Sequence, residues 1–376
     1  MSAILPPATI GILGGGQLGR MTALAARALG YRVHVLDPNP DCAARAVVER
    51  VVVAAFDDAA GAAELARACD VITIEIEQIA PAALEAALVH CPVRPGAAVL
   101  AVVRNRARQK AWLAAHDIPI GAYAHVRTAD ELRRAAATLG PSLFVKTCEG
   151  GFDGRGQARM DVTSDPDELF ASLGSREAVA EQGLDLALEL SVLVARRASG
   201  EMMVYRPAVN HHEQQVLAWS TLPGELPDDV VTRAQGLAVR IAEGLELQGI
   251  LTIEMFLLHD GRLLVNELAP RPHNSYHTSE LACPTSQFEQ LVRAVCDLPL
   301  GIAEPMRPAA IVNLFGDLWL RTAPPRFDEA LTVAGTRLFL YDKGAPKAGR
   351  KMGHLAAIGA TPAEALARVR DAAGRL

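Results

Sequence analysis

Residues 146–157 form a glycine-rich segment, Lys-Thr-Cys-Glu-Gly-Gly-Phe-Asp-Gly-Arg-Gly-Gln, directly after an apolar run at 142–145 that predicts a strand. Glycines allow the backbone to turn tightly and to direct successive N–H groups at an anion, and Lys146 adds a positive charge suited to phosphate. The spacing is not that of a Walker-type P-loop. A flexible surface hairpin is the alternative interpretation, but Lys146 and the Asp153/Arg155 pair favour a loop that binds nucleotide phosphates.

Residues 251–268 contain two apolar segments separated by Asp260-Gly261, which predicts a hairpin with a two-residue type I′ turn. In such a hairpin Glu254 lies directly opposite Glu267. Facing carboxylates on a half-buried sheet repel each other unless a cation lies between them. We therefore predict that the two glutamates bind Mg²⁺, which they would share with phosphate oxygens. A salt bridge from one glutamate to a nearby arginine is the alternative.

The whole chain limits the class of protein. Its 376 residues suggest two or three domains, and its net charge of −6 argues against a nucleic-acid partner. It has no apolar run of membrane-spanning length and no signal peptide pattern at its start. Its six cysteines include no Cys-x-x-Cys pair, so neither a zinc site nor a disulfide framework is predicted. We expect a cytoplasmic protein with small-molecule partners and no membrane or nucleic-acid partner.

The first residues predict a βαβ unit of a parallel sheet. A strand at 8–14 leads into Gly14-x-Gly16-x-x-Gly19 and a helix, and a second strand is followed by Asp37. Alone, this pattern is typical of dinucleotide binding, so an NAD-dependent oxidoreductase is the alternative function from another class. The phosphate-binding loop at 146–157 and the Glu254/Glu267 pair would have no role in hydride transfer. They therefore argue against the oxidoreductase. The same glycine turn could hold a substrate phosphate at the helix N-terminus.

The segment 146–157 resembles the phosphate loop of the 5-(carboxyamino)imidazole ribonucleotide synthase family, ATP-grasp enzymes of purine biosynthesis. Further segments also resemble the family and follow one another in the family's order along nearly the whole chain: 14–21, 75–77, 109–110, 181–182, 189–191, 266–275 and 349–354. The resemblance implies an α/β fold of three domains: a Rossmann-like domain at 1–104, an ATP-grasp domain with a glycine-loop lid at 105–304, and a small β-rich C-terminal domain at 305–376.

The family resemblance also implies a reaction. It is the ATP-dependent carboxylation of 5-aminoimidazole ribonucleotide with bicarbonate, which yields ADP and phosphate, with carboxyphosphate as the expected intermediate. ATP and Mg²⁺ are the implied cofactors, and a homodimer is the implied assembly. A formate-dependent glycinamide ribonucleotide ligase and a biotin-type carboxylase are alternatives with the same fold.

The resemblance carries over a set of ATP-binding residues: Arg106, Lys146, Gly151, Phe152, Asp153, Gly154, Arg155, Gly156, Gln157, Glu181, Gln182, Gly183, Leu184, Glu189, His212, Asn266 and Glu267. A solvated strand end is the alternative for Glu181. Five positions depart from the family pattern without removing a phosphate or metal group: Gln78, Asn105, Phe152, Gln215 and Ala348.

Two further groups are predicted around the reacting atoms. The residues after the hairpin could hold a carboxylate-like intermediate, and Asp153 could orient or deprotonate the amine; this catalytic group is Asp153, Arg271, His273 and Asn274. A structural hydrogen bond is the alternative for His273. A basic, glycine-containing segment at 341–351 is predicted to bind the substrate phosphate rather than to be a solvated loop; the substrate-binding group is Gly16, Gln17, Glu75, Arg155, Lys343, Arg350 and Lys351.

Overall fold

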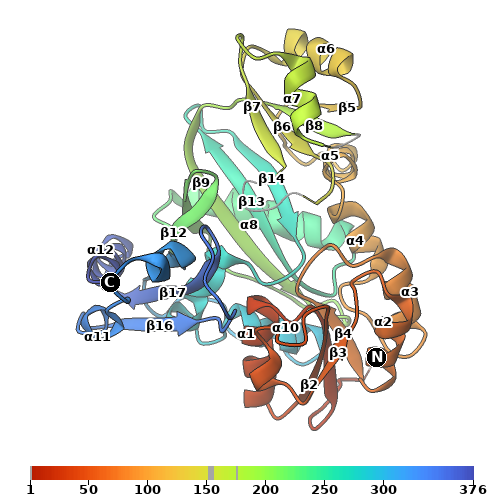
Figure 1. The fold of residues 1–376 in the computed structure, drawn as a ribbon, viewed down its shortest axis with the longest axis vertical. Helices are drawn as coiled ribbons and strands as arrows, with labels where there is room; N and C mark the ends of the chain where they lie inside the picture. The colour runs from red at the N-terminus through yellow and green to blue at the C-terminus, as the bar shows by residue number, and fades with distance from the viewer. Residues whose placement is uncertain (1, 151–155, 175–176) are drawn as a thin grey trace.

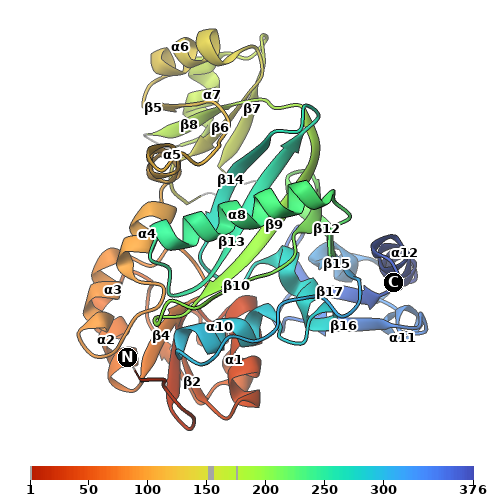
Figure 2. The same cartoon turned by 180° about the vertical axis from the view of Figure 1, so that it is seen from behind.

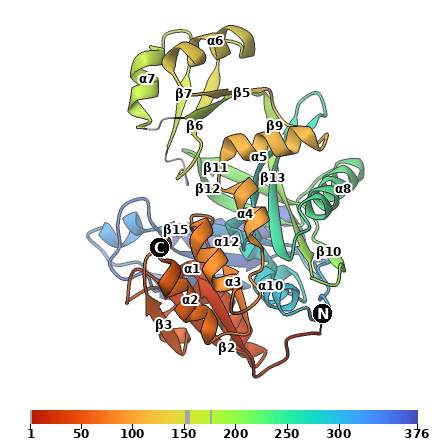
Figure 3. The same cartoon turned by 90° about the vertical axis from the view of Figure 1, so that its right-hand side faces the viewer.

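The computed structural model describes residues 2–150, 156–174 and 177–376, and these form an α/β structure. A small sheet lies at one end and the N-terminal domain at the other, with a large sheet running between them (Figures 1 and 3). Within these described residues, none of the helices combines the length and the apolar character that crossing a bilayer requires.

The N-terminal domain consists of β1 (Thr9–Leu13), α1 (Gln17–Ala28), β2 (Arg32–Asp37), η1 (Arg45–Val47), β3 (Arg50–Val53), α2 (Ala59–Arg67), β4 (Val71–Ile74) and α3 (Pro81–Leu88). Its strands are parallel in the order β3-β2-β1-β4. β1 and β4 are almost wholly buried, as expected for parallel strands covered on both faces. The predicted βαβ opening is confirmed.

The small sheet follows a helical linker, and the elements of this part are α4 (Ala97–Val103), α5 (Arg106–Ala115), β5 (Tyr123–Val126), α6 (Ala129–Leu139), β6 (Leu143–Thr147), β7 (Gln157–Met160), α7 (Pro166–Ser172) and β8 (Ala178–Gln182). The strands are antiparallel in the order β5-β8-β6-β7. Side-chain caps from Thr128 and Asp165 begin α6 and α7.

The large sheet and its connections contain β9 (Leu186–Arg196), β10 (Met202–Val204), β11 (Ala208–Glu213), β12 (Val216–Leu222), α8 (Asp228–Gly244), β13 (Gly249–Leu258), β14 (Leu263–Ala269), η2 (Asn274–Thr278), α9 (Ser279–Ala282), α10 (Gln287–Val295), β15 (Ala309–Phe315), η3 (Gly316–Leu320), α11 (Phe327–Ala330), β16 (Thr336–Leu340), β17 (Lys351–Ile358) and α12 (Pro362–Gly374). The strand order is β14-β13-β9-β11-β12-β15-β17-β16, and β10 pairs with β9. α8 lies across the face of β9 and β13 (Figure 2).

The C-terminal strands extend the large sheet instead of forming a sheet of their own. β12 pairs with β15 in antiparallel register, with Trp219 opposite Val312, so backbone groups at the edge of β12 are satisfied by the next segment of chain. The predicted domain limits at 104/105 and 304/305 stay a prediction. The second of them falls in the connection between α10 and β15.

The turn between β13 and β14 differs from the predicted type I′ turn. Leu258 N–H bonds the carbonyl of Arg262 and its own carbonyl accepts from Gly261 N–H, both at 2.9 Å, and of the two expected turn residues only Gly261 has a positive φ. The loop is therefore one residue longer than predicted. A β-bulge compensates, because the register shifts after Glu254 and leaves Asn266 as the extra residue. Glu254 consequently does face Glu267, as predicted.

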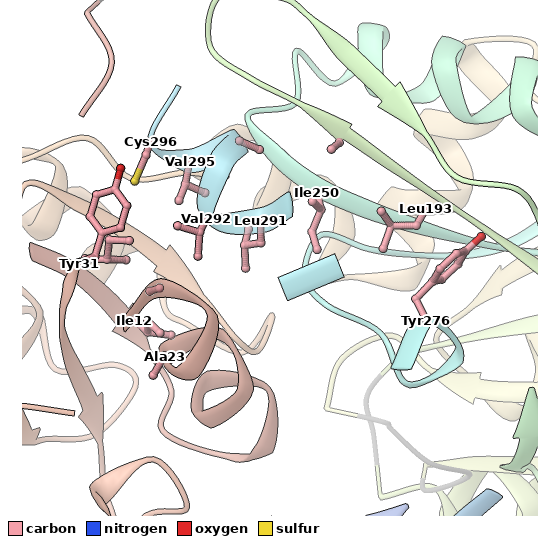
Figure 4. Packing of buried hydrophobic residues seen from close by; sticks show 14 of the residues in the cluster. Ile12, Ala23, Tyr31, Leu193, Ile250, Tyr276, Leu291, Val292, Val295 and Cys296 are labelled. Carbon is pink, nitrogen blue, oxygen red and sulfur yellow. The ribbon is translucent and has the colours of Figure 1, made fainter. Parts of the chain in front are cut away.

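One hydrophobic core joins the N-terminal domain to the large sheet. Tyr31 and Ile12 belong to the same buried cluster as Leu291 and Val295 of α10 and Ile250 of β13 (Figure 4). The cluster continues to Leu193 of β9 and to Tyr276 of η2, in the segment that follows β14. The N-terminal domain is thus held at a constant position relative to the strands that carry Glu254 and Glu267.

Candidate active site

Two lysines and a glutamate lie between the small sheet and the large sheet. Lys146, at the end of β6, donates to Glu181 Oε2 on β8 at 3.1 Å, and Lys110 Nζ of α5 lies 3.6 Å from the same oxygen. Lys110 is buried and also donates to the Asn266 carbonyl at 3.1 Å. Burial would raise the pKa of Glu181, but the two lysines outweigh it and lower that pKa. Glu181 is therefore a largely buried, ion-paired carboxylate and not a solvated strand end.

Arg106 connects the helical linker to both sheets. Its guanidinium donates to the Thr147 carbonyl at 3.0 Å and lies 3.7 Å from Glu267 Oε1. The alternative foreseen for the carboxylate pair, a contact from one glutamate to an arginine, is therefore present as well. Arg106 is placed to contact a phosphate bound between β6 and β14.

The bulge brings three oxygen-bearing side chains together. Glu254 and Glu267 are opposite each other, and Asn266 Nδ2 lies 3.4 Å from Glu254 Oε2. Asn266 Oδ1 is buried and has no hydrogen-bond partner among the described residues. Burial raises the pKa of Glu254, and the charge of Glu267 acts in the same direction. Carboxylate and amide oxygens are the donors that a hard divalent cation requires, so this set fits Mg²⁺.

The predicted nucleotide residues of β8, β9 and β11 border the same region. His212 Nδ1 lies 2.8 Å from Glu189 Oε2. Burial alone would lower the pKa of His212, but the bond to Glu189 and the charge of Glu254 raise it. The segment predicted to contact the base begins at the end of β8 with Glu181 and Gln182 and continues through Gly183 and Leu184 into the connection to β9, which joins the small sheet to the large one.

Most of the glycine loop lies outside the described residues, including five predicted site residues: Gly151, Phe152, Asp153, Gly154 and Arg155. Its two ends are described, with Gly156 accepting from Thr147 N–H at 2.8 Å. Gln157 pairs with Lys146 across β6 and β7, and its amide bonds the side chain of Gln215 in the turn between β11 and β12. The base of the loop is thus attached to the large sheet.

The segment after β14 carries the predicted catalytic residues. Arg271 Nε lies 2.8 Å from Glu77 Oε1, which belongs to the N-terminal domain. Asn274 is buried, and neither atom of its amide group has a hydrogen-bond partner among the described residues. An amide whose donor and acceptor are both available is suited to binding a ligand.

His273 has both a structural and a site-facing contact. Its Nδ1 accepts from Ser275 N–H at 3.4 Å, which begins η2, and its Nε2 lies 3.2 Å from Glu254 Oε1. Burial, with Arg271 and Lys351 nearby, lowers the pKa of His273 well below its usual value. A neutral ring with an accepting Nδ1 donates from Nε2, so His273 is a donor to Glu254. The structural hydrogen bond considered as an alternative is real, and it fixes this ring.

The glycine turn of the N-terminal domain does not offer its helix N-terminus to a phosphate. Gly16 N–H donates to Glu75 Oε1 at 2.7 Å, Gly19 N–H donates to the other oxygen of Glu75, and Gly15 N–H donates to Asp37 at 2.9 Å. A substrate phosphate would have to displace the Glu75 carboxylate to reach these N–H groups, and the role of Gly16 stays a prediction. Asp37, the expected ribose ligand of a dinucleotide site, is likewise engaged by the turn, which argues against the oxidoreductase.

The C-terminal basic segment meets that turn. Lys343 Nζ donates to Gln17 Oε1 at 2.5 Å, although the two residues are 326 positions apart. Arg350 is partly exposed and donates to the Ala345 carbonyl at 3.4 Å, and Lys351 begins β17. The structure therefore brings together the predicted substrate residues Gln17 and Lys343.

Sequence reasoning missed three residues of this region. Lys110 and Glu77 stood in segments that resemble the family, but neither received a role. Gln287 of α10 holds the backbone of His273 on both sides, accepting from its N–H at 2.8 Å and donating to its carbonyl at 3.0 Å. No local pattern marks Gln287, because its partner is fourteen residues away in another element.

Comparisons with known proteins agree along the whole chain. Three protein-family models match: the ribonucleotide synthetase preATP-grasp domain at residues 7–104, the ATP-grasp domain at 111–288 and the phosphoribosylaminoimidazole carboxylase C-terminal domain at 309–368. The N5-carboxyaminoimidazole ribonucleotide synthase of Bacillus subtilis is 39% identical over 94% of this chain and 92% of its own length. N5-carboxyaminoimidazole synthetase from Staphylococcus aureus complexed with ADP superimposes with a TM-score of 0.92 at 31% identity, covering 99% of this chain and 98% of its own. The Aspergillus clavatus synthase in complex with ADP and 5-aminoimidazole ribonucleotide superimposes with a TM-score of 0.90 at 30% identity, covering 98% of this chain and 99% of its own.

Proposed function

The chain belongs to the N5-carboxyaminoimidazole ribonucleotide synthase family, and from this membership we propose how its residues carry out the family reaction. The enzyme is an ADP-forming ATP-grasp ligase of purine biosynthesis that carboxylates 5-aminoimidazole ribonucleotide with bicarbonate. One observation carries the assignment of residues. The 3.2 Å contact of His273 with Glu254 joins the Mg²⁺-type oxygen donors to the segment of Arg271 and Asn274, so phosphate chemistry and carboxylation share one site.

Bicarbonate must first be activated, because its carbon is a poor electrophile. We propose that a bicarbonate oxygen attacks the γ-phosphorus of ATP while the bond to ADP breaks, giving carboxyphosphate. Lys146, Lys110 and Arg106 offset the negative charge of the phosphates. Glu254, Asn266 and Glu267 would hold Mg²⁺, which neutralises phosphate charge when bound. The neutral His273 donates to Glu254 and keeps that carboxylate in position.

The second step forms the carbon–nitrogen bond. The exocyclic amine of the ribonucleotide attacks the carbon of carboxyphosphate and displaces phosphate, or it adds to CO₂ after phosphate has already left. In both cases the nitrogen passes a proton to a base. The Arg271 guanidinium and the Asn274 amide hold the carboxylate-like group. Asp153 remains the predicted partner of the amine. Lys343, Arg350 and Lys351 hold the 5′-phosphate, with Gln17 contributing from the N-terminal domain. The family resemblance also supports a cytoplasmic homodimer, which analytical ultracentrifugation can check.

A crossed substrate assay tests this function. ADP release is measured with bicarbonate or formate, each combined with 5-aminoimidazole ribonucleotide or glycinamide ribonucleotide. We expect release only when bicarbonate and 5-aminoimidazole ribonucleotide are present together. Turnover with formate and glycinamide ribonucleotide would contradict the assignment.

A further inference from the structure

The ion pair between Glu77 and Arg271 joins the N-terminal domain to the carboxylation segment. Arg271 Nε lies 2.8 Å from Glu77 Oε1, and the two side chains are only 22% and 15% exposed. We propose that Glu77 is a positioning residue for the carboxylation step: it orients the Arg271 guanidinium toward the bicarbonate-derived group. This inference rests on the proposed function.

Arg271 lies among several carboxylates, so its orientation requires a definite partner. Glu77 makes the largest charge contribution to holding its proton, and Glu267 and Glu75 act in the same direction from farther away. Without Glu77 the guanidinium would lose the one partner that fixes its orientation, because the more distant Glu267 and Glu75 attract it without a direct contact. The pair with Glu77 keeps the cation of Arg271 next to the metal-type carboxylates without occupying them.

Glu77 is itself held rigidly. It follows β4, whose continuation is anchored by Glu75 through the N–H groups of Gly16 and Gly19 and through a 3.0 Å bond from Glu75 N–H to the Leu13 carbonyl. The glycine turn therefore fixes the chain from which Glu77 reaches the next domain. This gives a use for the turn that does not involve binding a nucleotide.

Arg271 keeps donors for a ligand while it is held. Its Nε faces Glu77, and its Nη1 donates to the Pro272 carbonyl at 3.2 Å. A guanidinium has five N–H donors, and these two contacts use two of them. The partly exposed edge can bind a carboxylate or phosphate oxygen, as bidentate recognition by arginine requires.

The ion pair is not what docks the domain. The interface also contains the hydrophobic core around Tyr31, Val292 and Val295 (Figure 4) and a bond from Arg94 to the Val295 carbonyl. Glu77→Gln keeps the size of the side chain and removes its charge. We therefore expect this variant to fold with a Tm close to that of the wild type while Arg271 loses its orientation.

A double-mutant cycle on the full-length enzyme tests the proposal. It compares Glu77→Gln, Arg271→Ala and the double variant for kcat and for the KM values of bicarbonate, the ribonucleotide and ATP. We expect Glu77→Gln to lower kcat/KM for bicarbonate about 10- to 100-fold, the scale of one charge-assisted contact, with the KM for ATP within about twofold of wild type. The double variant should be no worse than Arg271→Ala. Glu77→Asp should recover part of the loss, and Glu64→Gln, in the exposed pair with Arg50, should resemble the wild type.

Several outcomes would overturn the inference. They are wild-type kinetics in Glu77→Gln, additive losses in the double variant, an equal rise in the KM for ATP, or failure of both Glu77 variants to fold, which would give the pair a structural role. If the wild type itself forms no ADP with bicarbonate and 5-aminoimidazole ribonucleotide, the proposed function fails first and this inference fails with it.

Discussion

At the scale of single residues, the main feature of the site is the repulsion between Glu254 and Glu267, which a bound cation beside Asn266 would relieve. Two carboxylates face each other on a partly buried surface, and a buried amide oxygen beside them has no hydrogen-bond partner among the described residues. Such an arrangement is costly without a cation. Lys110 and Lys146 are paired with Glu181, whereas Arg106, 3.7 Å from Glu267 Oε1, offsets part of the repulsion.

Glu267→Gln should reduce kcat by at least about a hundredfold, because it removes a preorganised charge at the predicted Mg²⁺ site. The fold should persist, since repulsion from Glu254 is relieved. Initial rates over a Mg²⁺ titration, together with a melting curve, measure both effects. Glu243→Gln, at an exposed position of α8, should keep wild-type rates. Near wild-type turnover of Glu267→Gln at every Mg²⁺ concentration would exclude the metal role.

Arg350→Ala should raise the KM for the ribonucleotide substrate about 10- to 100-fold, which corresponds to the loss of one charge-assisted contact. The KM for ATP should hardly change, because the ATP phosphates are expected at Lys146 and not at the C-terminal segment. Lys347→Ala removes an exposed cation from the same basic segment and is the matched control. Steady-state kinetics with each substrate varied in turn measure both constants. Equal changes in the two KM values, or none, would reduce the segment to a structural loop.

At the scale of elements, two side chains of α5 contact the backbone of β14. Gln109 accepts from Leu268 N–H at 3.2 Å, and Lys110 donates to the Asn266 carbonyl at 3.1 Å. The second contact falls at the β-bulge, so the helix supports the backbone where Asn266 and Glu267 are placed in the site. The linker between domains thereby becomes part of the candidate ATP site.

Lys110→Met should destabilise the protein by about 1–3 kcal/mol, since a buried carbonyl loses its donor and Glu181 retains only one lysine. The KM for ATP should also rise about tenfold, because the variant removes one of the cations proposed to offset the charge of the ATP phosphates. Urea unfolding and steady-state kinetics measure the two quantities. Unchanged stability together with unchanged ATP binding would show that Lys110 contributes neither to the attachment of α5 nor to the ATP site.

At the scale of the whole molecule, one sheet and one core connect all the predicted domains. β15, β16 and β17 continue the sheet of β9, β13 and β14, and the N-terminal domain shares its core with α10. Two buried histidines lie where these parts meet. His277 of η2 stacks on His354 of β17, whose Nδ1 is 2.7 Å from the Tyr341 hydroxyl.

The buried His354 predicts how stability depends on pH. Burial lowers its pKa from 6.5 to about 3 in the folded protein. Below pH 6.5 the unfolded chain therefore binds a proton that the folded chain does not, so the free energy of unfolding falls as the pH is lowered from 6.5 toward 3. One such group contributes about 1.4 kcal/mol per pH unit.

The variant His354→Phe should lose this part of the slope in urea titrations from pH 7 to about 4. His90→Gln, at an exposed position, should keep the wild-type slope. Parallel slopes for His354→Phe and the wild type would contradict the prediction.

Local patterns in the sequence determined much of this protein. Apolar runs and turn residues predicted the βαβ opening and the strands that flank Asp260-Gly261. These signals act between neighbours in sequence and need no knowledge of the rest of the fold. The family resemblance supplied the order of the domains and the set of candidate site residues.

Only the tertiary structure decided which of those residues meet. The opposition of Glu254 and Glu267 depends on two single-residue shifts that cancel, one in the turn and one in the bulge. Glu75 closing the glycine turn, Glu77 holding Arg271, and Lys343 reaching Gln17 all join segments far apart in the chain. The contact of Glu75 follows from the pairing of β1 with β4 inside the N-terminal domain, whereas those of Glu77 and Lys343 follow from how the domains dock. Docking of the N-terminal domain depends on the hydrophobic core that it shares with the large sheet.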